Sequence, residues 1–134
     1  MDDLDFRYPA LSDLRHRAAQ RLPRFAFEYL DSATGSEAGA RRNRAALDRV
    51  GFRPAILSGD VQPDLTRSFL GRACTLPLGV APVGMSGLIW PRAEDILSRR
   101  ASAAGLPFCL STVSSSTPEA IAPNLDADNG WFQP

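Results

Sequence analysis

The chain has 134 residues, 44% of them hydrophobic, which is enough for one ordinary domain with a hydrophobic core. Its 15 Lys and Arg residues balance its 15 Asp and Glu residues, and a formal net charge of zero gives no electrostatic case for nucleic-acid binding. The acidic start MDDLDFRYPAL lacks the apolar stretch of a signal peptide, and no apolar run approaches the ~18 residues that cross a bilayer. We therefore expect a cytoplasmic protein, and leave peripheral attachment to the inner membrane open.

The two cysteines, Cys74 and Cys109, each lie in an apolar segment, and the chain has one histidine. These residues are too few for a conventional zinc site, so we expect no metal centre. A disulfide is the alternative to two free thiols. The cytosolic character of the sequence favours buried free thiols.

The first part of the chain predicts short helices separated by residues that end helices. They are expected over residues 13–22, 23–33 and 37–50. Ser12 and Ser36 precede two of them as candidate N-caps, and Pro23, Gly35 and Gly51 mark their ends. Pro23 also suits the first turn of the next helix, where its missing N–H costs nothing.

Short extended segments are predicted next, over residues 52–57 and 64–71, on either side of a turn region rich in Gly, Asp and Pro. We expect them to form a small hairpin-like layer. Pro54 favours an edge position in it, because proline donates no ladder hydrogen bond.

From residue 75 the predicted elements alternate between strand and helix. Strands are expected over residues 76–82, 106–111 and 130–133, and helices over 91–105 and from Pro118, with Thr117 as its N-cap. The side chains of the first of these helices that are expected to face inward are Ile96, Leu97, Ala101 and Ala104. This alternation is typical of parallel strands with right-handed crossovers, as in a doubly wound sheet or a (β/α)8 barrel. No G-x-G-x-x-G follows the first strand, which disfavours the dinucleotide-binding option.

Several stretches resemble one known family, in that family's order and spacing. They are LPRFAFEYLDSATGSE, NRAALDRVGFRP, DLTRSFLGRACTLPLGVAPVGM, ASAAGLPFCLSTVSSSTPEAIA and WFQ. On these segments the chain resembles the N-terminal part of the FMN-dependent α-hydroxy acid dehydrogenases and oxidases. The resemblance implies FMN as cofactor and an α/β fold, the N-terminal part of a (β/α)8 TIM barrel (about its first three strands) after a helical N-terminal segment. We accordingly expect helices and a short extended layer in residues 1–74, and the first βα units of an incomplete barrel in residues 75–134.

The resemblance also implies a cofactor-binding edge. The stretch PLGVAPVGMSG, residues 77–87, breaks just where a strand is predicted to end. There Pro82, Val83 and Gly84 match the family's segment whose backbone lies along the flavin ring, and backbone N–H groups reach such a ring only where side chains stay small. Ser111 and Gln133 match a flavin-contacting serine and a glutamine that bonds the flavin pyrimidine edge. Barrel enzymes place their chemistry at these carboxyl ends of strands.

Tyr29 has two interpretations. Its spacing in the second predicted helix is typical of an aromatic side chain packed in the core. The resemblance instead matches Tyr29 to the tyrosine that binds the substrate carboxylate. Val113 stands where some family members carry an aromatic residue above the substrate, so the size of the substrate is left open.

The catalytic histidine, substrate-binding arginines, flavin lysine and phosphate loops of the family have no counterpart in this chain. We expect His16, the single histidine, to be a surface residue and not the general base, so no catalytic residue is assigned.

The intact family oxidises an (S)-2-hydroxy acid, lactate- or mandelate-like, to the 2-oxo acid, and passes electrons to oxygen, a quinone or a cytochrome. We expect this chain to be truncated and inactive alone, and to work as a homo-oligomer when complete or with a complementing chain that carries the rest of the barrel. The alternatives are a non-redox FMN barrel similar to type 2 isopentenyl diphosphate isomerase and a non-enzymatic interaction module.

Overall fold

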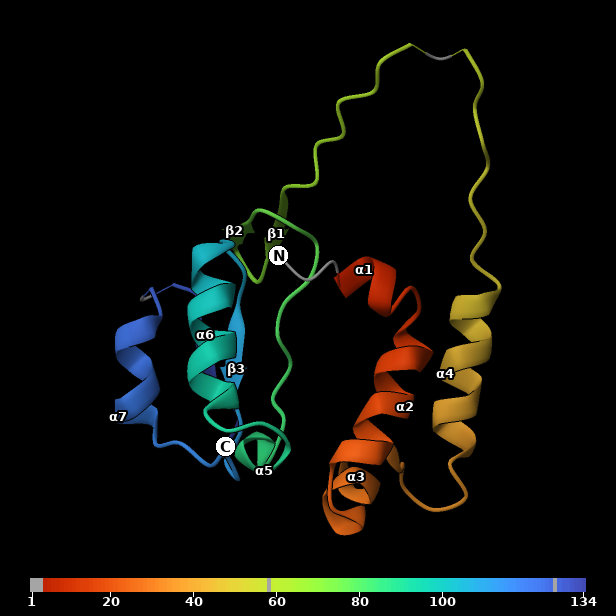
Figure 1. Cartoon of the computed structure of the whole chain (residues 1–134). Helices are drawn as coiled ribbons and strands as arrows, with labels where there is room; N and C mark the ends of the chain where they lie inside the picture. Colours follow the sequence, from red (N-terminus) through yellow and green to blue (C-terminus); the bar gives the residue numbers. More distant parts are fainter. Residues whose placement is uncertain (1–3, 58, 127) are drawn as a thin grey trace. The chain divides into compact units, whose positions relative to one another are not determined.

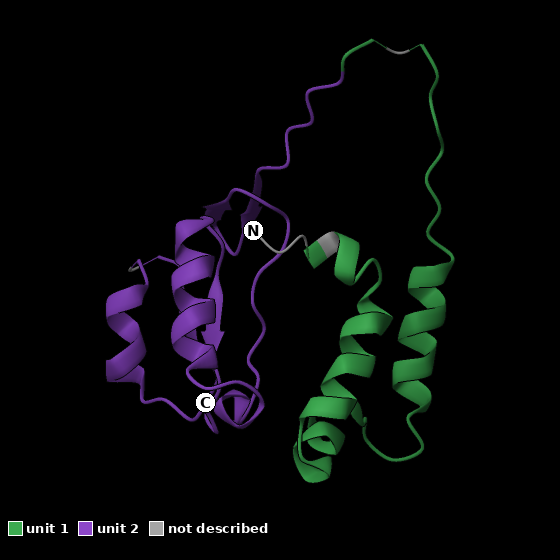
Figure 2. Cartoon of the chain, viewed as in Figure 1, with its two compact units in different colours: residues 1–60 green, residues 61–134 purple. Residues whose placement is uncertain are grey.

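The computed structural model describes residues 4–57, 59–126 and 128–134. The chain divides into two compact units, residues 1–60 and 61–134 (Figure 2). Each unit is described by itself. None of the helices in the described part of the chain is both long and apolar enough to cross a membrane.

The first unit is helical, as the sequence predicts (Figure 1). Its helices are α1 (Leu4–Arg7), α2 (Leu11–Arg21), α3 (Arg24–Asp31) and α4 (Ala38–Asp48). The predicted N-caps Ser12 and Ser36 are both wrong. Helix α2 begins one residue before Ser12, and its N-cap Ala10 donates its N–H to Asp13 Oδ2 at 3.0 Å. The N-cap of α4 is Glu37, in the left-handed conformation with φ 59°.

Helices α2 and α3 are joined by a two-pronged ion pair. Arg15 donates Nε–H to Asp31 Oδ1 at 2.5 Å and Nη2–H to Asp31 Oδ2 at 2.7 Å. Ala26 is the buried residue of α3, whereas Phe25 is 67% exposed. Tyr29 and Leu30 of the same helix are exposed as well.

A β-hairpin is the first regular element of the second unit. Strand β1 (Arg67–Phe69) pairs antiparallel with β2 (Arg72–Cys74). Leu70 and Gly71 connect them with positive φ angles of 49° and 81°, the conformation of a tight hairpin turn. The predicted pairing of residues 52–57 with 64–71 is wrong, because the described residues of 52–57 form no strand and both arms of the hairpin lie within 67–74.

Parallel pairing follows, in the predicted order. Val80 forms a parallel bridge with Phe108, and β3 (Phe108–Leu110) pairs parallel with β4 (Gly130–Phe132). Val80 donates its N–H to Pro107 O at 2.8 Å and accepts the Cys109 N–H at 3.0 Å. The first predicted strand is thus reduced to a bridge, and its Leu78 is 56% exposed rather than covered on both faces. The described strands form no closed barrel.

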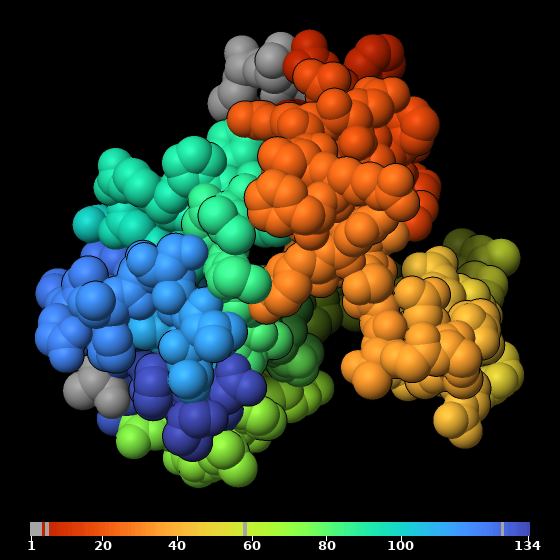
Figure 3. Space-filling model, turned by 90° about the horizontal axis from the view of Figure 1, so that it is seen from below, coloured from red at the N-terminus to blue at the C-terminus, as the bar shows by residue number. Residues whose placement is uncertain are grey.

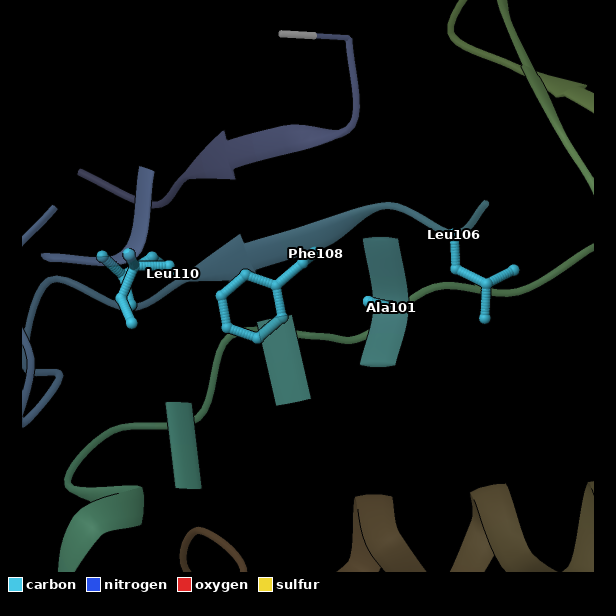
Figure 4. Packing of buried hydrophobic residues seen from close by; sticks show 5 residues of the cluster. Ala101, Leu106, Phe108 and Leu110 are labelled. Carbon is cyan, nitrogen blue, oxygen red and sulfur yellow. The ribbon is translucent and has the colours of Figure 1, made fainter. Parts of the chain in front are cut away.

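The helices of this unit pack around the one that lies along the parallel layer. They are α5 (Ser86–Ile89), α6 (Ala93–Ala103), α7 (Pro118–Ile121) and the 3₁₀ helix η1 (Ala122–Asn124). Figure 1 shows α6 lying along β3, with α7 beside it. Thr117 caps α7 as predicted, since its Oγ1 accepts the Ala120 N–H at 3.3 Å. The core lies between layer and helices and consists of Ala101, Leu106, Phe108, Leu110 and Ile121 (Figure 4).

The inward face of α6 differs from the prediction. Of the expected side chains, Ala101 is buried, whereas Ile96, Leu97 and Ala104 are exposed. The buried residues of this helix are Ala93, Glu94, Ser98 and Ala101. Polar residues occupy the inward face because partners on the neighbouring loop and on η1 satisfy them.

Candidate functional site

The carboxyl ends of the three parallel segments meet at one level. In the parallel register Val80 lies opposite Phe108, and Phe108 lies opposite Gly130. Three positions after Val80, Phe108 and Gly130 lie Val83, Ser111 and Gln133, respectively. Sequence-predicted residues from all three strand ends therefore fall on the same row, at the edge where parallel α/β sheets bind ligands.

Ser111 is held in place by the turn that follows β3. It is buried, and its Oγ accepts the Val113 N–H at 3.3 Å while its carbonyl accepts the Ser114 N–H at 3.0 Å. The Val113 carbonyl accepts the Met85 N–H at 2.8 Å. The turn after β3 is therefore bonded to the loop after the first strand.

Hydrogen-bond donors at this edge are left unused. The backbone N–H groups of Val83 and Gly84 form no hydrogen bond with any described residue. Gln133 is exposed; its backbone N–H donates to Leu110 O at 2.9 Å and its carbonyl accepts the Thr112 hydroxyl. Its side-chain amide makes no hydrogen bond within the described part of the chain. Pro82 beside them has no N–H and no bulky side chain, so the backbone here stays accessible.

A buried carboxylate lies directly behind this edge. Glu94, near the start of α6, is 3% exposed, and its Oε1 accepts the Ser115 N–H at 2.9 Å and the Ser114 hydroxyl at 3.3 Å. Burial raises the pKa of this carboxyl, but hydrogen bonds from its own N–H, from Ser115 N–H and from the Ser86 and Ser114 hydroxyls outweigh burial and lower the pKa below its usual value. The sequence analysis missed Glu94. Its signal is a glutamate in the first turn of a helix, followed across one strand by a run of serines.

A narrow cleft connects Glu94 with the strand ends. Its lining includes Val83, Ser86, Glu94, Cys109 and Ser111. Burial raises the pKa of the Cys109 thiol, which keeps it protonated, and both cysteines are free as predicted. The described residues contain no cluster of metal ligands.

Tyr29 lies in the other unit, on α3, and is 47% exposed. It is therefore not a buried core aromatic residue. His16 is exposed on α2, with its Nε2 3.0 Å from Gln20 Nε2, which confirms the predicted surface position.

The sequence profile described as FMN-dependent dehydrogenase matches residues 18–134. The chain belongs to the FMN-dependent dehydrogenase family. FMN is thus the cofactor that the family implies.

Relatives in this family have been named as hydroxy acid enzymes. The chain is 38% identical to the L-lactate dehydrogenase of Ectopseudomonas mendocina (strain ymp) over 124 residues, covering 92% of this chain and 32% of the relative. It is 34% identical to the (S)-mandelate dehydrogenase of Pseudomonas putida, covering 92% of this chain and 31% of that protein. The chain therefore spans about a third of the length of these relatives.

Solved structures of the FMN-dependent dehydrogenase family share the fold. A soluble mutant of the membrane-associated (S)-mandelate dehydrogenase from Pseudomonas putida superposes with a TM-score of 0.79 at 34% identity, covering 92% of this chain and 35% of that one. A mandelate oxidase variant carrying the C4a-OH-FMN adduct gives a TM-score of 0.77 at 36% identity, covering 90% of this chain and 36% of that one.

Proposed function

We propose that this chain provides the first strands of the FMN site and one substrate contact in an enzyme that oxidises an (S)-2-hydroxy acid to the 2-oxo acid. The observation that carries the proposal is the row of unused donors at the carboxyl ends of adjacent parallel segments. The family match and the names of its lactate and mandelate relatives support the same reaction.

The strand-end residues fit the ring of FMN. An isoalloxazine ring carries acceptors at N5 and O4, and the free N–H groups of Val83 and Gly84 are donors of the required kind. Beside them Pro82 offers a flat, apolar contact. The Gln133 amide both donates and accepts, which suits the mixed pyrimidine edge. Ser111 directly follows β3, which pairs with both neighbouring segments. When bound, FMN supplies the acceptor for the hydride equivalent that leaves the hydroxy acid.

Tyr29 is proposed to bind the substrate carboxylate. Its phenol O–H is a donor on a half-exposed side chain of α3, and a hydrogen bond to an ionised acceptor is about twice as strong as a neutral one. Val113, 55% exposed in the turn after β3, would leave room near the substrate. Both lactate-like and mandelate-like acids are therefore candidate substrates.

We further propose that residues 75–134 are the opening of a (β/α)8 barrel and that residues 1–74 precede it. Among the described strands, β4 pairs only with β3, so its other edge is available to a further strand. The remaining strands would cover this edge, whether they belong to the complete subunit of a homo-oligomer or to a complementing chain.

The test is a chimera in which this chain replaces the part of the Pseudomonas putida (S)-mandelate dehydrogenase that it matches. We expect a yellow protein whose flavin absorbance is bleached by mandelate or L-lactate. The 134-residue chain alone is the control. We expect it to reduce no dye, because its single histidine, His16, is a surface residue and no general base is assigned in the chain.

Two other outcomes would contradict the proposal. A yellow chimera that no hydroxy acid bleaches would favour a non-redox FMN barrel. A colourless chimera with a native-like circular dichroism spectrum would favour an interaction module.

A further inference from the structure

Glu94 is a carboxylate with an unusual number of donors for a buried side chain. Beside the Ser115 N–H and Ser114 hydroxyl on Oε1, its Oε2 accepts the Ser116 hydroxyl at 3.5 Å. These partners lie on three consecutive residues of one loop, 20 to 22 positions further along the chain. The Ser115 N–H can only donate, and an ionised carboxylate accepts from it and from both hydroxyls at once.

The loop that Glu94 holds is the one that carries Ser111. Residues 111–116 turn back on themselves through the Ser114 N–H to Ser111 O bond at 3.0 Å and the Ser116 N–H to Ser114 Oγ bond at 3.0 Å. Glu94 anchors the far side of this turn. A displacement of the Glu94 carboxylate is therefore expected to displace this turn, which includes Ser111.

The same loop is packed tightly on the segment after Gly84. Met85 N–H donates to Val113 O at 2.8 Å, and the buried Ser86 hydroxyl is among the donors to Glu94. A Cβ atom on Gly87 would lie 2.7 Å from Ser115 Oγ, so α5 and the loop pack closely at this point. Glu94 thus connects two of the three strand ends that form the proposed flavin edge.

We propose that Glu94 is a positioning residue for the flavin edge: its carboxylate fixes the loop of residues 111–116 against residues 83–86, and so sets the positions of Ser111 and of the free N–H groups of Val83 and Gly84. The inference rests on the proposed FMN site, and Glu94 itself touches neither flavin nor substrate. A residue with a purely structural role would affect folding and leave the flavin environment of the folded protein unchanged.

The first experiment concerns the loop and needs no flavin. In ¹H–¹⁵N NMR spectra of the full 134-residue chain, Glu94→Gln is expected to move the Ser115 amide proton upfield and to shift the amides of residues 111–116. Glu119→Gln is the matched control, because Glu119 also lies in the first turn of a helix but is exposed. If Glu94→Gln fails to fold, Ser114→Ala removes one donor and is expected to give a smaller shift of the same amides. An unchanged Ser115 amide in these variants would overturn the inference.

The second experiment measures the flavin edge in the mandelate dehydrogenase chimera. Glu94→Gln is expected to raise the FMN dissociation constant about tenfold and to change the flavin absorption spectrum, since charge-assisted bonds that set the geometry become neutral ones. Glu119→Gln is expected to match the parent, and Glu94→Asp to recover part of the affinity. An unchanged dissociation constant and spectrum in a folded Glu94→Gln chimera would reduce Glu94 to a structural anchor and overturn the inference.

The two proposals fail in different ways. A parent chimera that binds no FMN overturns the proposed function and with it the flavin role of Glu94. A parent that binds FMN together with an insensitive Glu94→Gln variant overturns only the role of Glu94.

Discussion

The indole of Trp131 stacks on the phenyl ring of Phe69, with ring centroids 5.1 Å apart and planes 16° from parallel. Trp131 is the middle residue of β4, and Phe69 ends β1, so the contact ties the hairpin to the last parallel strand. An ion pair between Arg72 of β2 and Asp128, in the turn before β4, also joins the hairpin to this part of the chain. Figure 3 shows the C-terminal residues in dark blue beside the yellow-green hairpin. The hairpin is therefore an integral part of the second unit.

The stacking of Phe69 on Trp131 should contribute measurably to the free energy of unfolding. Phe69→Ala is expected to lower the free energy of unfolding by about 1–2 kcal/mol, because it removes a stacked aromatic pair and part of its buried area. Denaturant unfolding of the chain provides the value. Phe52→Ala is the matched control, since Phe52 is 100% exposed. In a double-mutant cycle with Trp131→Ala, strictly additive effects would show that the two rings do not interact.

Gly79 is expected to be irreplaceable for a packing reason. A Cβ atom there would lie 2.7 Å from Pro107 Cγ and 3.1 Å from the Pro107 carbonyl oxygen, the acceptor of the Val80 N–H. Gly79→Ala should therefore cost about 1–3 kcal/mol by pushing the first strand away from β3. Gly51→Ala provides the comparison, because nothing lies within 4 Å of a Cβ at Gly51. Equal unfolding midpoints for the two variants would contradict this account.

Asp95 joins α6 to η1 and should give the second unit a specific acid sensitivity. The Asn124 amide, Arg99 and Arg92 donate to it, and these bonds lower the pKa of Asp95 from 3.8 to about 2. A carboxyl whose pKa is lower in the folded state stabilises the fold above its unfolded pKa, and this contribution is lost as the pH falls through the folded pKa. The contribution of Asp95 is therefore complete above pH 3.8 and disappears toward pH 2.

The measurement compares unfolding free energies of the parent chain and Asp95→Asn between pH 5 and pH 2. We expect the difference between them to shrink as the pH falls through this window. Other carboxyls with lowered pKa values, including Asp31 and Asp64, titrate in both proteins and cancel in the difference. Asp48→Asn, at an exposed ion pair, serves as control. A difference in unfolding free energy that does not change with pH would show that these bonds do not stabilise the ionised form of Asp95.

The sequence was most informative where local chemistry decides the structure. Thr117 followed by Pro118 predicted the start of α7, and short apolar runs predicted β3 and β4 in parallel order. The sequence was least informative where residues distant along the chain determine which side chains are buried. Glu94 and Ser98 face inward because loop and η1 partners bond to them, and periodicity of apolar side chains carries no trace of those partners.

The residues of the candidate site also fall into two groups: those that the sequence indicates and those that only the folded chain reveals. Val83, Ser111 and Gln133 were predicted from the family resemblance, at predicted strand ends, and each follows a residue of matching register by three positions. Their contact with the flavin stays a prediction. Glu94 escaped detection because its partners lie across an intervening strand. A buried carboxylate is recognised by its donors, and those are known only from the folded chain.

Tyr29 gives the most direct test of the proposed substrate contact. In the mandelate dehydrogenase chimera, Tyr29→Phe should lower kcat/KM for the hydroxy acid about tenfold or more while FMN stays bound, because one hydrogen bond to an ionised carboxylate is lost. Tyr8→Phe is the comparison, a tyrosine of the same unit without an assigned role. An unchanged kcat/KM for every hydroxy acid tested would remove Tyr29 from the site.

Gly84 tests whether the backbone itself contacts the flavin. Its N–H is one of the unused donors, and glycine permits the closest approach of a ligand to the backbone. Gly84→Val places a branched side chain on that surface, so in the chimera we expect FMN content to fall to a small fraction of the parent while the apoprotein melts within a few degrees of it. Gly51→Val, at an open position, should retain its flavin. Flavin absorbance per protein and thermal melting are measured on the same samples. Full FMN occupancy in Gly84→Val would show that the ring lies elsewhere, because a β-branched side chain and a flat ligand cannot both occupy the face of that peptide.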